Sequence, residues 1–253
     1  MHILLSNDDG YDSEGLRCME TTLGELATVW TVAPDQGQSA MGRAITLQRP
    51  LKVTQVSERH FKVNGTPSDC VNLAVNGLLP VRPDLVVSGI NQGANMGDDI
   101  SYSGTAAAAF EATILGLPAI AMSLACRKDM QFMPAARFAA ALARSVCATG
   151  LPPYVFLNVN VPDTKGADIV DYVITHQGRS LYAKTVSATT CPRDLTYYWL
   201  GGKGVAFEDI DGSDANAVRK GLISITPIRT DLTDYESLEC VRSINIDGFS
   251  QKG

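Results

Sequence analysis

Short apolar runs alternate with stretches of helical spacing along the first 165 residues. The runs have the length of buried strands, and they lie at residues 3–5, 27–33, 84–89, 118–124 and 155–158. The stretches between them place apolar residues three or four positions apart, at residues 14–26, 70–79, 106–115 and 135–148. This order predicts an α/β fold with a mostly parallel sheet, built from right-handed strand–helix–strand units.

Alternation with a period of two predicts additional strands in two other regions. One region precedes the third long run, and its short strands are predicted at residues 46–47, 51–56 and 60–63. The other region begins at about residue 167, and its hairpin strands are predicted at residues 169–175, 181–187 and 195–200. The second region resembles an arm added to the core, which is a common device for oligomerisation.

The C-terminal part is predicted to return to the core. We expect a glycine-rich turn, an acidic surface loop, a last core strand and a closing helix at residues 201–204, 209–216, 221–227 and 235–241. The chain is then one domain, residues 1–253, with two parts. The core is expected at about 1–165 and 221–228, and the extension at about 166–220 and 229–253.

Two adjacent carboxylates, Asp8 and Asp9, follow the first predicted strand, and Gly10 after them permits a tight turn. In open α/β sheets, ligand sites collect beyond the carboxyl ends of the strands. The pair is compatible with a solvated turn, because Asp and Asn bond to their own backbone. It is equally compatible with a site for a hard cation, which prefers oxygen ligands and would cancel the repulsion between the carboxylates.

Two later segments are expected at the same edge of the sheet. The polar loop 35–43 follows the second strand and makes Ser39 and Arg43 candidate ligand and anion contacts. Residues 103–105, Ser-Gly-Thr, open the helix at 106–115, and the free N–H groups of a helix start can bind an anion. An ordinary Ser/Thr helix cap explains the same residues, and the Gly-Lys-Ser/Thr ending of a Walker loop is missing.

The composition and charge of the chain limit which partners and which cellular location we expect. The 27 acidic and 21 basic residues give a formal charge of −6, which disfavours a nucleic-acid polymer as partner. No apolar run reaches the ~18 residues of a membrane helix, and no basic segment leads a long apolar run at the N-terminus. We therefore expect a cytoplasmic protein without a membrane partner, whose six cysteines are reduced. Three scattered histidines and no Cys-x-x-Cys spacing disfavour a zinc site.

Strand ends that meet at one edge would bring oxygen ligands for a cation next to a helix start that can hold a phosphate. The candidate ligands are Asp8, Asp9, Ser39 and Asn91. A metal ion beside a phosphate cradle is the equipment for phosphomonoester hydrolysis.

Five motifs in chain order resemble the SurE family, the stationary-phase survival proteins with 5'- and 3'-nucleotidase activity. They are Leu5-Ser-Asn-Asp-Asp-Gly10, Val32-Ala-Pro34 with Ser39, Gly65-Thr-Pro67 with Asp69-Cys-Val71, Val87-Ser-Gly-Ile-Asn91 and Tyr102-Ser-Gly-Thr105. The resemblance continues almost to the end of the chain, through Asn158-Val-Asn-Val-Pro162, Tyr198-Trp199 and Ile225-Thr-Pro227. One departure from the family pattern is Ala40, at a position where glycine is common.

The resemblance implies a Rossmann-like, three-layer core and an extension that is exchanged between the subunits of a homodimer or homotetramer. It implies one divalent cation per subunit, Mg²⁺ or Mn²⁺, held by Asp8, Asp9, Ser39 and Asn91, with Asp8, Asp9 and Asn91 as the catalytic residues. Contacts to the substrate phosphate are expected from Asn7, Arg43, Asn95, Ser103, Gly104 and Thr105. The implied substrates are nucleoside 5'- and 3'-monophosphates, with short-chain polyphosphate as a further candidate.

Three other functions were weighed against this one. A phosphatase of the haloacid dehalogenase type uses Asp-x-Asp, whereas the acids here are adjacent. A receiver-like signalling domain needs an aspartate at the end of a later central strand, where this chain has Ala33-Pro34 and Ser88-Gly89. A metal-dependent nucleotide sensor without turnover has no such conflict and remains the alternative.

Overall fold

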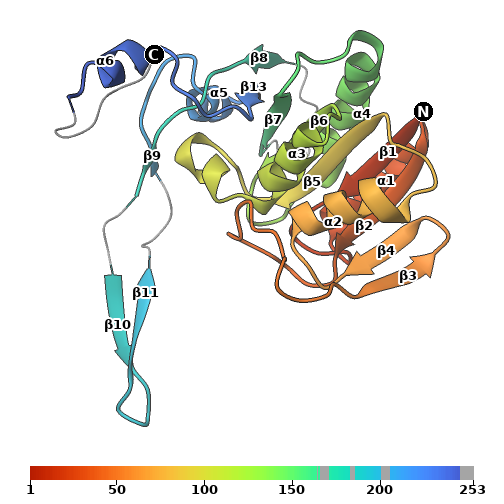
Figure 1. The fold of residues 1–253 in the computed structure, drawn as a ribbon, viewed down its shortest axis with the longest axis horizontal. Coiled ribbons are helices and arrows are strands. Elements are labelled where there is room, and N and C mark those ends of the chain that lie inside the picture. Colours follow the sequence, from red (N-terminus) through yellow and green to blue (C-terminus); the bar gives the residue numbers. More distant parts are fainter. Residues whose placement is uncertain (164, 166–170, 183–185, 201–205, 246–253) are drawn as a thin grey trace.

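The computed structural model describes residues 1–163, 165, 171–182, 186–200 and 206–245. Among these residues, nine strands form one central sheet in the order β3-β4-β2-β1-β5-β6-β7-β13-β8 (Figure 1). The six strands from β4 to β7 are mutually parallel, whereas β3 and β13 each run antiparallel to a neighbour. The strands are β1 (His2–Ser6), β2 (Thr28–Pro34), β3 (Val53–Ser57), β4 (His60–Val63), β5 (Leu85–Gln92), β6 (Ala119–Ala125), β7 (Val155–Pro162), β8 (Tyr172–Ile174) and β13 (Ile223–Arg229).

Helices cover both faces of the sheet and give the three-layer, Rossmann-like core that the resemblance implies. Helices α1 and α4 pack together on one face, and α2 and α3 pack together on the other. Their bounds are α1 (Glu14–Gly24), α2 (Pro67–Leu73), α3 (Gly104–Ile114) and α4 (Phe132–Thr149). A π-helical turn, η1 (Ala74–Leu78), continues α2, and a 3-10 helix, η2 (Gly97–Ser101), precedes α3.

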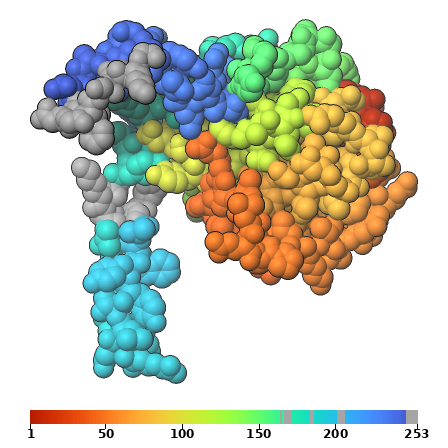
Figure 2. All heavy atoms as spheres, in the orientation of Figure 1, coloured from red at the N-terminus to blue at the C-terminus, as the bar shows by residue number. Residues whose placement is uncertain are grey.

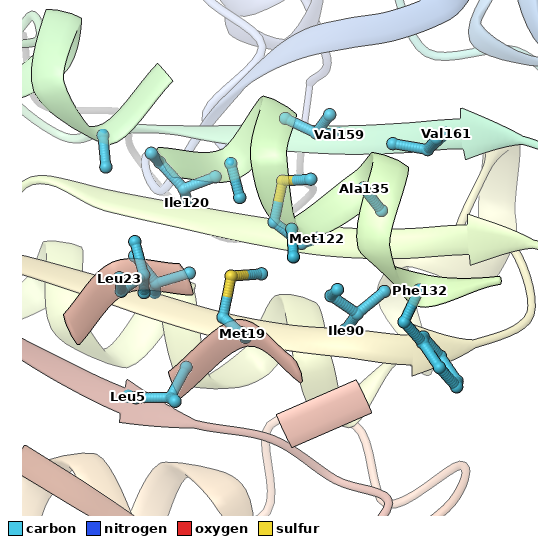
Figure 3. Close-up of a cluster of buried hydrophobic side chains, with 14 of the residues drawn as sticks. Leu5, Met19, Leu23, Ile90, Ile120, Met122, Phe132, Ala135, Val159 and Val161 are labelled. Carbon is cyan, nitrogen blue, oxygen red and sulfur yellow. The ribbon is translucent and has the colours of Figure 1, made fainter. Parts of the chain in front are cut away.

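Strand residues alternate between two apolar clusters, one on each face of the sheet. Ile3 and Leu5 point toward α1 and α4, whereas Leu4 between them points toward α2 and α3, as the period of two requires. Figure 3 shows the first cluster, in which Met19 and Leu23 of α1 approach Leu5. Each buried aliphatic side chain of this kind contributes about 1.5–3 kcal/mol to the stability of the fold.

Several predicted boundaries were wrong, because hydrogen bonds outweighed the apolar pattern. Residues 46–47 are not a strand: both the backbone N–H and the hydroxyl of Thr46 donate to the carboxylate of Asp69, at 2.9 and 2.7 Å. Strands β5 and β7 do not end at residues 89 and 158 but continue to Gln92 and Pro162. The predicted acidic loop contains the start of helix α5 (Asp214–Arg219), because the hydroxyl of Ser213 caps it.

The extension contains short elements, some of which join the core. Strand β8 pairs with β13, and α5 packs on β13 and β7. The other elements are β9 (Ser180–Leu181), β10 (Val186–Thr190), β11 (Thr196–Leu200), β12 (Ala206–Phe207) and the closing helix α6 (Leu238–Arg242), which confirms the predicted C-terminal helix. The predicted turn at 201–204 and part of the predicted strands at 169–175 and 181–187 lie outside the described residues. The division into core and extension at residues 165 and 221 stays a prediction.

The β10–β11 hairpin stands away from the rest of the molecule (Figures 1 and 2). Its large apolar side chains are exposed, namely Val186, Leu195, Tyr197, Tyr198, Trp199 and Leu200. All six cysteines are free thiols, as expected. Among the described residues, no helix has both the length and the apolar character needed to cross a membrane.

Candidate functional site

The crevice of the sheet lies at the carboxyl ends of β1 and β5. The chain passes from β1 to β2 on one side and later returns to β5 on the other, so β1 has both strands as parallel neighbours. The two connections cover opposite faces, because α1 lies on one face and α2 on the other. Such a reversal of strand order leaves an open crevice, which is where doubly wound sheets bind their ligands.

A cavity of about 280 Å³ lies in this crevice, and we call it the carboxylate cavity. Six residues predicted from the sequence line it together: Asp8, Asp9, Ser39, Asn91, Asn95 and Ser103. The structure also places seven other residues in its walls: Ala40, Gln92, Gly93, Ala94, Asp99, Tyr102 and Arg127. The four residues expected to bind a metal thus lie around one cavity, although they come from three separate segments of the chain.

Asp8 is the most buried acid of the cavity, with 5% of its surface exposed. Burial raises the pKa of its carboxyl above the ordinary value. The hydroxyl of Thr105 donates to Asp8 Oδ1, and the backbone N–H groups of Thr105 and Gly104 also favour the charged form. The N-terminus of α3 therefore holds a carboxylate of the protein itself, with the positive end of the helix directed at it.

Gly104 makes this approach possible. A Cβ atom at residue 104 would lie 2.6 Å from Cβ of Asp8 and 2.9 Å from its Oδ2. Any larger side chain would push the helix away from the carboxylate. The predicted contacts of Gly104 and Thr105 with a substrate phosphate stay a prediction, because the contact that the structure records is with Asp8.

Asp9 is half-buried and carries the second charge of the pair. Burial, and then the neighbouring charge of Asp8, raise its pKa from 3.8 to about 6, while the N–H of Gln92 lowers it. That N–H donates to Asp9 Oδ2 at 3.1 Å. Among the described residues, neither Asp8 nor Asp9 has an ion-pair partner within 4.0 Å. The cavity therefore presents two adjacent carboxylates that form no ion pair with the described residues.

Asn91 is brought to the cavity by an irregularity in β5. The register between β5 and β6 shifts between Ser88 and Asn91, and such a shift redirects the side chains that follow it. The amide nitrogen of Asn91 donates to the backbone oxygen of Gly93 at 2.8 Å. Among the hydrogen bonds of the described residues, none uses its carbonyl oxygen, which is therefore the atom available to a ligand.

Ser39 is exposed on the opposite wall, in a loop tied to β1. The backbone N–H of Gln38 donates to the carbonyl of Asp8 at 2.7 Å, which brings the loop over the carboxylates. Ala40 has a φ of 59°, in the left-handed region that favours glycine. The departure from the family pattern thus falls at a residue whose backbone is strained, next to a predicted ligand.

Asn95 anchors the loop after β5 to the core. Its N–H donates to Asn160 Oδ1, its amide nitrogen donates to Ser123 Oγ, and its carbonyl accepts from the amides of Asn158 and Asn160, all at 2.8–2.9 Å. The Asn-Val-Asn motif of β7 therefore fixes the floor of the cavity. Any contact of Asn95 with a phosphate would use the second hydrogen of its amide group.

Like Gly104 and Thr105, the predicted phosphate contacts Asn7 and Arg43 do not line the carboxylate cavity. Asn7 is fully buried beneath it, where its amide nitrogen donates to Gly10 O and Ser13 Oγ at 3.0 and 2.7 Å. Arg43 lines a different pocket, with its guanidinium 4.4 Å from the centre of the Phe110 ring. Their role in phosphate binding stays a prediction, and for Arg43 it requires the side chain to leave the ring.

Sequence reasoning missed several wall residues, of which Arg127 is the most informative. It follows β6 by two residues, so the strand-end rule that singled out Asp8 and Asn91 applies to it as well. Asp99 and Tyr102 lie in and after η2, where no apolar pattern signals a position facing a cavity. Gln92 contributes its backbone N–H rather than its side chain, which a sequence motif does not reveal.

The donor set of the carboxylate cavity fits a hard divalent cation. It offers two carboxylates and neutral oxygens from an amide and a hydroxyl, and a cation would remove the repulsion that raises the pKa of Asp9. Among the described residues, no group of three His, Cys, Asp or Glu side chains is placed to bind a metal. A cation held by two acids and neutral oxygens keeps part of its water shell, which is typical of Mg²⁺.

Comparison with known proteins agrees with the fold and identifies the family. A family model described as "Survival protein SurE" matches residues 3–184. The 5'-nucleotidase SurE of Geotalea uraniireducens (strain Rf4) is 49% identical over 243 residues, covering 96% of this chain and 98% of the relative. That of Myxococcus xanthus (strain DK1622) is 50% identical over 251 residues, covering 98% and 95%. The crystal structure of the SurE protein from Aquifex aeolicus superposes with a TM-score of 0.84 at 36% identity, covering 96% and 98%. This chain therefore belongs to the SurE family.

Proposed function

We propose that this protein is a divalent-metal-dependent phosphomonoester hydrolase that releases phosphate from nucleoside 5'- and 3'-monophosphates. The observation that carries the proposal is the pair of adjacent carboxylates at the end of β1, which lack a cationic partner among the described residues. Relatives named 5'-nucleotidase SurE, which match almost the full chain, support the choice of nucleotides as substrates.

Asp8, Asp9, Ser39 and Asn91 would hold the cation, Mg²⁺ or Mn²⁺. When bound, it supplies positive charge that polarises a phosphoryl oxygen and stabilises the charge that develops in transfer. Asp8 is held in place by the bond from the Thr105 hydroxyl at the start of α3, so it serves as the fixed ligand. Asn91 is oriented by its bond to Gly93, which leaves its oxygen for the cavity.

The remaining groups of the cavity handle the water and the phosphate. Asp9 is the more exposed of the two acids, so it is the one placed to take a proton from the attacking water. The hydroxyl of Ser103 accepts a bond from the N–H of Ala106, so its own hydrogen is free to donate to a phosphoryl oxygen. Such a donor, fixed before the reaction begins, stabilises the transition state at no cost of reorganisation.

The test is phosphate release from a panel of nucleoside 5'- and 3'-monophosphates and a short-chain polyphosphate, with chelator, Mg²⁺ or Mn²⁺. We expect release that requires the metal and is abolished in Asp8→Asn. Asp12→Asn is the matched control, because Asp12 is exposed, pairs with Lys62 at 2.8 Å and lies outside the carboxylate cavity. Activity that persists in chelator or in Asp8→Asn would contradict the proposal.

The alternative function is a nucleotide sensor, and the same panel separates it from the enzyme. Metal-dependent binding of nucleotides without phosphate release, measured by calorimetry, would support the sensor. The sensor would use the same cavity, since a hard-cation site also binds a phosphate that is not turned over.

We also propose that the extension joins copies of this chain into a homodimer or homotetramer. The support is the apolar surface of the β10–β11 hairpin, where Trp199 is 68% and Leu200 88% exposed. An apolar surface of this kind on a projecting hairpin is typical of an interface. Sedimentation at micromolar concentration tests it: a parent protein that is monomeric would contradict the proposal, and Trp199→Ser together with Leu200→Ser should shift the assembly to monomer.

A further inference from the structure

A second cavity, of about 520 Å³, adjoins the carboxylate cavity and shares four wall residues with it: Gly93, Ala94, Asp99 and Arg127. We propose that this second cavity binds the nucleoside part of the substrate and that Arg127, at the junction, binds its phosphate. The proposal rests on the proposed function, since it names the subsites of the same substrate.

The walls of the second cavity are mainly apolar, and Asp99, Arg127 and Arg219 are their charged side chains. On the core side they include Met96 and Cys126, and on the side of the extension they include Phe207 of β12 and Val218 of α5. Pockets for the organic part of a ligand are lined mainly by apolar and aromatic side chains, with a few polar groups that set its orientation. A base can stack on the ring of Phe207, because aromatic rings pack face to face with an offset.

The carboxylate cavity, in contrast, is lined mostly by carboxylates, amides and hydroxyls. It suits a cation and a phosphoryl group better than it suits a base. The two cavities together therefore match the two ends of a nucleoside monophosphate, with the phosphate over the carboxylates and the base toward the extension.

Asp99 lies at the junction, where a ribose would pass. Its Oδ1 accepts a bond from the hydroxyl of Tyr182 at 2.5 Å, which fixes the carboxylate. Among the described residues, no hydrogen bond uses its Oδ2, which is available as an acceptor for a ribose hydroxyl, a contact that acidic side chains make in many nucleotide sites.

Arg127 is the positive group at the junction. Among the described residues that line the carboxylate cavity, it is the one Lys or Arg, and no ion pair within 4.0 Å involves it. Its guanidinium lies over Gly93, where an added Cβ would be 3.5 Å from Nε and 3.8 Å from Nη2. A planar guanidinium binds two phosphate oxygens at once, which a surface lysine does not do.

The outer wall is fixed in place by a buried carboxylate at the start of α5. Asp214 is fully buried and accepts from the N–H groups of Gly97, Gly178 and Ala215, at 2.9, 3.0 and 2.7 Å. These bonds join η2, the extension and α5. The second cavity is thus formed before a ligand arrives, which lowers the entropy that binding costs.

Two products of the proposed reaction test the subsites separately, because neither can be hydrolysed. We would titrate a panel of four ribonucleosides, and separately inorganic phosphate, into the full-length protein with Mg²⁺ by calorimetry. Val218→Phe, which fills the cavity, and Phe207→Ala, which removes the stacking ring, should each weaken nucleoside binding at least tenfold and change phosphate binding less than twofold. Arg127→Gln should weaken phosphate binding at least tenfold and change nucleoside binding less than twofold.

Two controls accompany these variants. Lys128→Gln removes the same charge one residue away, outside both cavities, and should leave both affinities unchanged. Tyr102→Ala removes an exposed ring that lines the carboxylate cavity alone. Urea midpoints within experimental error of the parent value establish that each variant is folded. If Val218→Phe fails this criterion, Val218→Leu replaces it, and if Phe207→Ala fails it, Phe207→Leu replaces it.

The outcomes are distinct. The nucleoside subsite would be overturned if both Val218→Phe and Phe207→Ala bind nucleosides as the parent does. It would also be overturned if Tyr102→Ala loses nucleoside binding instead, or if the parent binds no nucleoside. Phosphate affinity that is the same in Arg127→Gln and Lys128→Gln would overturn the role of Arg127. If the subsites respond as expected but no nucleotide is hydrolysed, the proposed function fails while the subsites stand.

Discussion

Replacing Asp9 by asparagine should stabilise the metal-free protein, although it removes a proposed ligand. In the folded protein, burial and the charge of Asp8 raise the pKa of Asp9 from 3.8 to about 6. A difference of about two pH units corresponds to about 3 kcal/mol at 1.36 kcal/mol per unit. Because Asp9 is half-buried, water screens part of this energy, and we expect a gain of about 1–2 kcal/mol at pH 7.5.

The sign of the pH dependence follows from the raised pKa. Below pH 3.8, Asp9 is protonated in both the folded and the unfolded chain, so its charge costs nothing. Between pH 3.8 and 6, the folded state binds more protons than the unfolded state, and the free energy of unfolding of the parent falls as the pH rises. Above pH 6, Asp9 is charged in both states, and its destabilising effect on the folded protein no longer changes with pH. The difference between Asp9→Asn and the parent should therefore grow steadily between pH 4.5 and 6 and reach a plateau above pH 6.5.

Urea denaturation with chelator, at half-unit steps from pH 4.5 to 7.5, measures this difference. Asp12→Asn makes the same chemical change at an exposed acid whose pKa is lowered by Lys62, so it should give no gain. Saturating Mg²⁺ should reduce or reverse the advantage of Asp9→Asn, since a ligand of the folded state stabilises the parent. An Asp9→Asn protein that is no more stable than the parent at pH 7.5, or a difference that does not vary with pH, would refute the reasoning.

Three other predictions follow from the contacts around the site. Gly104→Ala places a Cβ 2.6 Å from Asp8 and should lower phosphate release about 100-fold, whereas Gly24→Ala, with no atom within 4 Å, should not change it. Thr105→Val removes the hydroxyl that donates to Asp8, and it should lower the free energy of unfolding in urea by about 2 kcal/mol. It should also move the acid limb of the pH–rate profile to higher pH, whereas Thr105→Ser should keep the parent profile. Asp214→Asn replaces one carboxylate oxygen by an NH2 group, which then faces at least one of the three backbone donors. It should cost about 2–4 kcal/mol, and an unchanged urea midpoint would show that those bonds contribute nothing.

The inner strands of the central sheet were predictable because they are buried on both faces and read as apolar runs. The part of β5 beyond Gly89 was not, since Asn91 and Gln92 are polar and are held in the strand by backbone pairing with β6. Helix α5 was not predicted for a similar reason. Its stability depends on the Ser213 cap and on hydrogen bonds that Asp214 accepts from distant N–H groups, and no local sequence pattern reveals these contacts.

The site residues that directly follow strands were predictable, because ligand sites collect beyond the carboxyl ends of the strands. That rule placed Asp8 and Asn91 around one cavity, and it would have found Arg127 if it had been applied to β6 as well. It could not place Arg43, because the reach of a long side chain depends on its partners, and here the ring of Phe110 holds the guanidinium elsewhere. It also could not show that the start of α3 is occupied by Asp8, since that contact requires the exact spacing of two separate elements.

The buried carboxylate of Asp214 sets the order in which the molecule is completed during synthesis. Its bond to the N–H of Gly97 joins residues 117 positions apart. The strands up to β7 can pair as the chain emerges, but the loop that carries Asn95 and Asp99 is closed from outside only when α5 has been made. Contacts of such long sequence separation form late in folding. A ribosome that stalls after β7 therefore leaves a chain with strands β1 to β7 of its sheet assembled and its carboxylates in place, but with the outer wall of the substrate site still missing.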